Sequence, residues 1–159
     1  MLRALGGALL ILAGALAGFE RLSVQRRRLA CLRSLADALG RLAVELETLQ
    51  SPLEEALSHL TGCPLTASVY QSFGAAPFET LWTRAADAQP ISADERRAVA
   101  ALGGVLGRCS AERQAAELSL ARRRLTDMAD ALEREIAARS RRFPLLGAAL
   151  GAIAAVMLF

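Results

Sequence analysis

Residues 29–49 read LACLRSLADALGRLAVELETL, and this stretch decides the fold. Its leucines recur in steps of three and four over three heptads, at Leu29, Leu32, Leu35, Leu39, Leu42, Leu46 and Leu49. Such spacing places them on one narrow face of an α-helix. The stretch therefore predicts a long amphipathic helix that packs against other helices.

A second long helix is expected from residue 111 to residue 142. Its apolar positions also follow steps of three and four, at Leu118, Ala121, Leu125, Met128, Leu132 and Ile136. No segment shows the convincing apolar–polar alternation of a β-strand. The expected fold class is therefore all-α, a helical bundle of about six helices whose long first and last helices continue into one transmembrane segment at each terminus.

Prolines, glycines and capping residues divide the middle of the chain into short helices. Proline suits the first turn of a helix, and serine followed three residues later by glutamate forms a capping box. The helices are expected over 52–61 and 64–73, from Pro77, and from Ser92 to Gly107. The residues expected to open or cap them are Ser51, Pro52, Glu54, Ser92 and Glu95.

Two uncharged apolar segments, residues 4–19 and 143–159, stand at the ends of the chain. Each is about 25 Å long as a helix, slightly less than the ~30 Å hydrocarbon core, and bilayer thinning or snorkelling arginines accommodate the difference. Arginines flank both segments on the side of the chain's middle, and such arginines stay cytoplasmic. We expect an N-terminal anchor at 1–19, a cytoplasmic domain at 20–142 and a second membrane segment at 143–159.

The N-terminal segment has an alternative interpretation as a cleaved signal peptide. Arg3 precedes the apolar run, and Ala15-Leu16-Ala17 matches a cleavage site of the A-x-A kind. Arg21 and Arg26–Arg28 follow the run and resist translocation, which favours an uncleaved anchor.

Gly14 and Gly18 lie four residues apart, as do Gly147 and Gly151, so these pairs are candidates for close helix packing in lipid. The alternative is that glycine is simply common in this sequence.

Composition excludes much chemistry. All 19 cationic residues are arginine, so a Walker phosphate loop and a Schiff-base enzyme, which both need lysine, are excluded. The single histidine, His59, cannot build a catalytic zinc site that needs two imidazoles, and it is expected at an exposed position. Three cysteines without C-x-x-C pairs are expected to act as small apolar residues in a reducing compartment. We expect no enzyme activity, no cofactor, no metal and no small-molecule substrate.

The arginine clusters have separate explanations. Arg122–Arg124 spread around a helix and lack aromatic neighbours, so a solvated face is expected rather than a nucleic-acid site. Arg26–Arg28 and Arg139–Arg142 are expected to contact anionic lipid headgroups.

Several motifs resemble the stage III sporulation protein AB family of endospore-forming bacteria. They are Gly18-Phe19-Glu20, Leu42-Ala43-Val44-Glu45-Leu46, Ser51-Pro52-Leu53-Glu54-Glu55-Ala56-Leu57, Leu102-Gly103-Gly104-Val105-Leu106-Gly107 with Gln114 downstream, and a terminal span with Leu146-Gly147 and Gly151. The resemblance covers nearly the whole chain. One departure is Ser110, which stands where the family usually has an aspartate. Both residue types can cap a helix, so the last helix is expected to keep its cap.

The resemblance implies a role and partners. The family is similar to the cytoplasmic domains of inner-membrane platform proteins of type II secretion and type IV pilus machines. It implies a place in the mother-cell membrane around the forespore, in a channel complex with other membrane proteins. Its implied partner is a secretion-type ATPase, stage III sporulation protein AA.

A docking face for that ATPase is expected where the glycine motif has little side chain, around Gly103, Gly107, Arg108 and Gln114. The alternative for the glycines is tight packing against the first long helix. Two other roles stay open from the residues alone, a generic membrane-anchored helical adaptor and a secreted helical protein with a cleaved signal.

Overall fold

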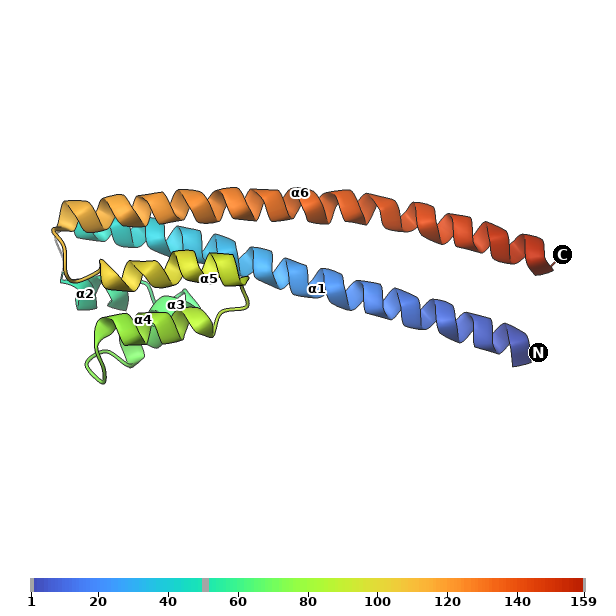
Figure 1. The fold of residues 1–159 in the computed structure, drawn as a ribbon, viewed down its shortest axis with the longest axis horizontal. Helices are drawn as coiled ribbons and strands as arrows, with labels where there is room; N and C mark the ends of the chain where they lie inside the picture. The colour runs from blue at the N-terminus through green and yellow to red at the C-terminus, as the bar shows by residue number, and fades with distance from the viewer. Residues whose placement is uncertain (1, 50–51, 159) are drawn as a thin grey trace. The chain divides into compact units, whose positions relative to one another are not determined.

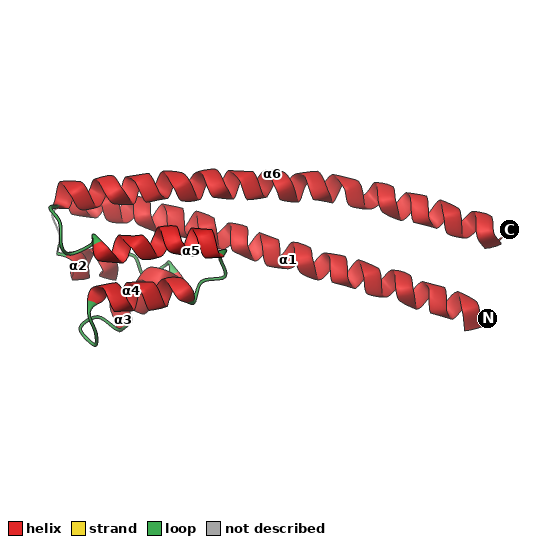
Figure 2. Cartoon of the chain, viewed as in Figure 1, coloured by secondary structure: helices red, strands yellow, loops and turns green. Residues whose placement is uncertain are grey.

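The chain is all-helical in a computed structural model that describes the backbone of residues 2–49 and 52–158 and the side chains of residues 22–48 and 52–139 (Figure 1). No residue in these ranges belongs to a strand (Figure 2). The elements are α1 (Leu2–Val44), the π-helical η1 (Glu45–Leu49), α2 (Leu53–Ser58), α3 (Pro64–Gln71), α4 (Phe78–Asp87), α5 (Ala93–Ala100), the 3-10 helix η2 (Ala101–Gly104) and α6 (Ala111–Leu158). The predicted all-α fold is confirmed.

The chain divides into two compact units. One consists of residues 28–129 and holds the second part of α1, all the short helices and the first part of α6. In it α3 contacts both α2 and α4, and α4 contacts α5 and η2. The other unit consists of residues 1–27 and 130–159, and the buried side chains of Leu132 and Ile136 belong to it. We call residues 28–129 the helical domain.

Membrane spans find no support in the structure. Among the described residues, no helix has the length and apolar character needed to cross a bilayer. The predicted segments at 1–19 and 143–159 lie outside the residues whose side chains are described, although the backbone of 2–19 belongs to α1 and that of 143–158 to α6. Both spans, and the domain boundaries drawn from them, stay predictions.

The core of the helical domain is built from the predicted leucine seam. Leu32, Leu35, Leu39 and Leu42 of α1 are at most 1% exposed, and Leu118 and Leu125 of α6 are fully buried. From the short helices come Leu57, Leu65, Val69, Trp82 and Val99. Burying one such side chain stabilises the fold by about 1.5–3 kcal/mol, so this core holds the short helices together.

Two predicted helix ends are wrong. The helix expected over 52–61 ends at Ser58, and turns follow because Thr66 Oγ1 donates to the carbonyls of Leu60 and Cys63. The helix expected to reach Gly107 ends at Ala100 and tightens into η2. Gly103 and Gly104, which lie in the expected continuation, provide the reason, since glycine weakens an α-helix.

The predicted caps have different outcomes. The capping box of Ser92 and Glu95 is confirmed. Ser51 lies outside the described residues; α2 has Pro52 at its N-cap and no side-chain cap hydrogen bond, with Glu54 exposed in its first turn. Ser110 precedes α6, and its carbonyl accepts a hydrogen bond from the backbone N–H of Gln114 at 2.9 Å.

Candidate partner-docking site

The glycine motif forms a turn that leads from α5 into α6. Gly103 is buried in this turn, and a Cβ atom placed on it would lie 3.1 Å from Cδ1 of Trp82 and 3.4 Å from Cα of Glu79. The predicted alternative of tight packing therefore describes Gly103, but its neighbour is α4 rather than the first long helix. Gly103 itself offers little surface to a partner.

Trp82 packs against the buried side of this turn. Its ring is fully buried, and its Nε1 donates a hydrogen bond to the carbonyl oxygen of Val99 at 2.7 Å. The Phe78 ring lies against it, with the ring centroids 5.6 Å apart. A buried indole that is both packed and hydrogen-bonded holds α4 and α5 in a fixed arrangement.

Gln114 closes the loop between η2 and α6. It is 8% exposed, its Oε1 accepts from the Gly107 N–H at 3.1 Å, and its Nε2 donates to the Cys109 carbonyl at 2.6 Å. One side-chain amide thus satisfies two backbone groups of the loop. The Gln114 side chain therefore binds within the domain and fixes the position of Gly107.

The exposed part of the motif consists of Gly104, Gly107 and Arg108. Gly107 has φ of 77°, a conformation that costs other residues about 1–2 kcal/mol. No atom lies within 4 Å of a Cβ placed on Gly104, so the space beside it is open. Arg108 Nη1 lies 3.1 Å from Glu79 Oε2, and both side chains are more than half exposed. We call Gly104, Gly107, Arg108 and Glu79 the glycine-turn surface.

Arg28 has a partner inside the protein. Its Nε lies 3.0 and 3.2 Å from the two carboxylate oxygens of Glu95, whose side chain is 3% exposed. The Glu95 carboxylate also accepts from the Ser92 N–H at 2.6 Å. The expectation that all of Arg26–Arg28 contact headgroups is therefore wrong for Arg28, because a buried carboxylate captures it.

The electrostatics of this ion pair show in the pKa of Glu95. Burial on its own raises the pKa, but the hydrogen bonds from Arg28 and Ser92 outweigh that effect and hold the pKa of Glu95 below its usual value. Glu95 therefore stays charged and ties the start of α5 to α1.

Cys31 is half-buried and His59 is exposed. Burial raises the pKa of the Cys31 thiol to about 11, with further contributions from Cys63 and Glu95, so the thiol stays protonated at neutral pH. His59 is exposed at the C-cap of α2, and its Nδ1 lies 3.4 Å from Glu45 Oε1. Among residues with described side chains, no cluster of His, Cys, Asp and Glu could hold a metal ion.

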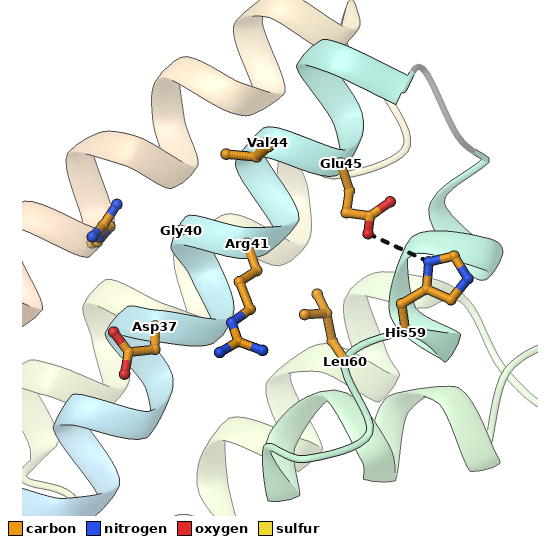
Figure 3. A pocket seen from close by; sticks show the side chains of 8 residues that line it. Asp37, Gly40, Arg41, Val44, Glu45, His59 and Leu60 are labelled. Carbon is orange, nitrogen blue, oxygen red and sulfur yellow. Dashed lines mark hydrogen bonds and ion pairs between the residues drawn. The ribbon is translucent and has the colours of Figure 1, made fainter.

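Sequence reasoning missed a charged groove in the helical domain (Figure 3). Asp37 and Arg41 of α1 and Glu45 of η1 line it in a row of four-residue steps, opposite His59 and Leu60. Gly40, Val44 and Arg122 complete the lining of this open groove, which has a volume of about 520 Å³. One signal in the sequence could have indicated it, namely Gly40 beside the leucine seam. A glycine in a helix allows a side chain of another helix, here Arg122 of α6, to lie close to the backbone.

The glycine pairs proposed for helix packing in lipid lie outside the residues whose side chains are described. Gly14 and Gly18 belong to α1, and Gly147 and Gly151 to α6, by their backbone. Their role stays a prediction.

Comparison with known proteins gives one result. The family model described as stage III sporulation protein AB matches residues 3–159. No curated protein and no solved structure matches the chain significantly.

Proposed function

The chain belongs to the stage III sporulation protein AB family, and from this premise we propose that it is a non-enzymatic platform of the channel complex between mother cell and forespore. Its helical domain would dock the secretion-type ATPase, stage III sporulation protein AA. The observation that carries the proposal is the family match over residues 3–159.

The proposed location is the mother-cell membrane around the forespore. The uncharged segments 4–19 and 143–159 support it, together with the arginines that flank each of them. In this arrangement the helical domain is cytoplasmic, both termini lie across the membrane, and other membrane proteins of the channel contact the two spans.

The glycine-turn surface is the proposed contact for the ATPase. Gly104 and Gly107 leave backbone without side chains, which permits close approach of a partner. Arg108 and Glu79 stand beside them and are more than half exposed, so they can exchange their mutual ion pair for polar contacts with a partner. Gln114 and Trp82 support the proposal indirectly, because a surface held rigid from beneath loses little entropy on binding.

The experiment is co-purification of the full chain with the ATPase, with and without ATP. Gly107→Arg and Gly104→Arg should each lower recovery of the complex about tenfold or more, because a long side chain then occupies the contact. Gly107→Ala is the matched control, since it carries the same backbone strain at φ 77° without the bulk. Gly104→Arg has no such strain and open space, so it separates blocked binding from damaged folding. Full recovery with both arginine variants would rule out the contact.

The membrane arrangement needs its own test. Reporter enzymes fused after residues 142 and 159 should report opposite sides of the membrane, and the mass of the N-terminal peptide should show Met1 or its direct neighbour. A mature protein that begins after Ala17 would instead support the cleaved signal.

A further inference from the structure

The aromatic residues of the helical domain are concentrated at one place. Residues 28–129 contain Tyr70, Phe73, Phe78 and Trp82 and no other aromatic side chain. Of these four rings, only that of Trp82 is fully buried. The other three lie partly or largely at the surface, whereas the rest of the core is built mainly from leucine and alanine.

Three of the rings form a continuous series from the core to the surface. The ring centroid of Phe78 lies 5.6 Å from that of Trp82, and the centroid of Phe73 lies 6.3 Å from that of Phe78. Phe73 is 36% exposed, and Tyr70, one helical turn earlier, is 39% exposed. The connection between α3 and α4, drawn green in Figure 2, carries no charge from Phe73 to residue 77. We call Tyr70, residues 73–77 and Phe78 the aromatic tip.

The aromatic tip borders the glycine-turn surface. Phe78 is followed in the chain by Glu79, which pairs with Arg108 and belongs to that surface. Cα of Glu79 lies 3.4 Å from a Cβ atom placed on Gly103, so the first turn of α4 belongs to both regions. Aromatic side chains beside a polar, solvent-accessible rim are typical of protein–protein interfaces.

From this continuity we propose that the ATPase contact extends from the glycine-turn surface over the aromatic tip, with Phe73 and Tyr70 as its apolar anchors. The inference rests on the proposed function, because it names further residues of the same contact. The matching surface of the ATPase is an apolar pocket that receives Phe73, with polar groups at its edge for Arg108 and Glu79. Phe78 supports the Phe73 ring from within the domain, so the anchor loses little freedom on binding.

The charged pair beside the rings favours a protein partner over the interior of a lipid bilayer. Arg108 and Glu79 are both more than half exposed, and they would lose their water if the aromatic tip entered hydrocarbon. A protein surface offers an apolar pocket for the rings together with hydrogen-bonding groups for the two charges.

The test measures the affinity of the full chain in lipid nanodiscs for the purified ATPase by biolayer interferometry. Phe73→Ala and Tyr70→Ala should each weaken binding about tenfold or more, since truncation of an interface anchor has a large cost. Leu120→Ala is the matched control, because this apolar side chain of α6 is 44% exposed and lies outside the aromatic tip, and it should stay within about twofold. Urea midpoints followed by Trp82 fluorescence should stay close to wild type. Tyr70 lies within α3, where alanine favours the helix, so Tyr70→Ala keeps the test decisive if Phe73→Ala is unstable.

The salt dependence separates the apolar anchors from the charged rim. Raising the salt from about 0.15 M to about 0.5 M weakens interactions between exposed charges. The loss caused by Phe73→Ala should therefore be the same at both concentrations, whereas the loss caused by Arg108→Ala should shrink at the higher one. A Phe73→Ala effect that disappears at high salt would contradict an apolar anchor.

The outcomes distinguish this inference from the proposed function. Wild-type protein that does not bind the ATPase overturns both. Binding that is lost in Gly104→Arg but stays within about twofold in Phe73→Ala and Tyr70→Ala overturns the aromatic tip alone. An equal loss in Leu120→Ala also overturns it, because the effect is then not local. If Phe73→Ala lowers the mass of the protein itself in light scattering and leaves ATPase binding unchanged, the aromatic tip joins two copies of this chain and the inference is wrong.

Discussion

The ion pair between Arg28 and Glu95 provides the sharpest test of the fold. Glu95→Gln removes the negative charge and keeps the size of a side chain that is 3% exposed. The wild-type carboxylate accepts from Arg28 through both oxygens and from the Ser92 N–H. The glutamine side chain keeps one acceptor oxygen. Arg28 and the Ser92 N–H therefore lose a charged acceptor, and one of their hydrogen bonds is lost altogether.

The size of the effect follows from these contacts. A hydrogen bond to a charged group contributes about 1.5–3 kcal/mol, and breaking a fully buried pair costs about 3–5 kcal/mol. The Arg28 side chain is 35% exposed, so its guanidinium regains water in the variant and lowers the cost. We therefore expect Glu95→Gln to reduce the free energy of unfolding by about 2–3 kcal/mol.

The assay is urea unfolding of the full chain followed by fluorescence of Trp82. It is the single tryptophan, it is fully buried, and it bonds to α5, so its signal reports unfolding of the helical domain. Asp94→Asn is the matched control, because Asp94 is next in the chain and its side chain is 76% exposed. The control should change stability by less than about 0.5 kcal/mol.

The pH dependence of unfolding checks the charge itself. The pKa of Glu95 in the folded protein lies below its usual value of 4.5, so its stabilising contribution is complete above that pH and is lost as the pH falls through the folded-state pKa. The difference between wild type and Glu95→Gln should therefore shrink below about pH 4.5. A variant as stable as wild type at pH 7, or a difference that persists unchanged in acid, would refute the assigned ion pair.

Three further predictions concern single positions. Gly103→Ala should lower the free energy of unfolding by about 1–3 kcal/mol because its methyl group meets the Trp82 ring, whereas Gly104→Ala should stay within about 0.5 kcal/mol; urea unfolding measures both, and equal effects would contradict the packing. Cys31 should resist iodoacetamide at pH 8, where about one thiol in a thousand is ionised, and react as the pH approaches 11; fast labelling of this residue by mass spectrometry at pH 8 would show that the thiol is not protonated as described. Gly40→Ala should raise the free energy of unfolding by about 0.5–1 kcal/mol in the same urea experiment, since alanine favours a helix and the obstructing Arg122 side chain can move; a clear loss of stability would mean that the arginine is fixed.

The long helices could be predicted from the sequence because a seam of leucines is a repeated signal. Leu32, Leu35, Leu39 and Leu42 all lie in the core as their spacing predicts. The capping box of Ser92 and Glu95 was equally readable, because it depends on residues three apart. Local patterns of this kind need no knowledge of distant contacts.

The candidate sites were less predictable because their residues meet across the fold. Gln114 was expected at a docking face, but both ends of its amide bond to the loop that precedes it in the chain. Glu95 was expected only as a cap, and its ion pair with a residue 67 positions away has no local signal. The end of α2 differs from the expected end where Thr66 bonds back to the Leu60 carbonyl from six residues further along the chain. The glycines that end α5 could be read from the sequence, but the contact of Gly103 with Trp82 of α4 could not.

The distribution of satisfied polar groups indicates where a partner can act on the helical domain. The buried polar side chains Thr66, Gln89, Glu95 and Gln114 all form hydrogen bonds with groups of this chain. Substituting any of them would disturb folding before it disturbed binding, because a buried group would lose its partner. The glycine-turn surface differs in that the exposed side chains of Arg108 and Glu79 can change partner without opening the core. Binding variants that leave Trp82 fluorescence and urea unfolding unchanged should therefore map to the glycine-turn surface with the adjoining aromatic tip and not to the buried network.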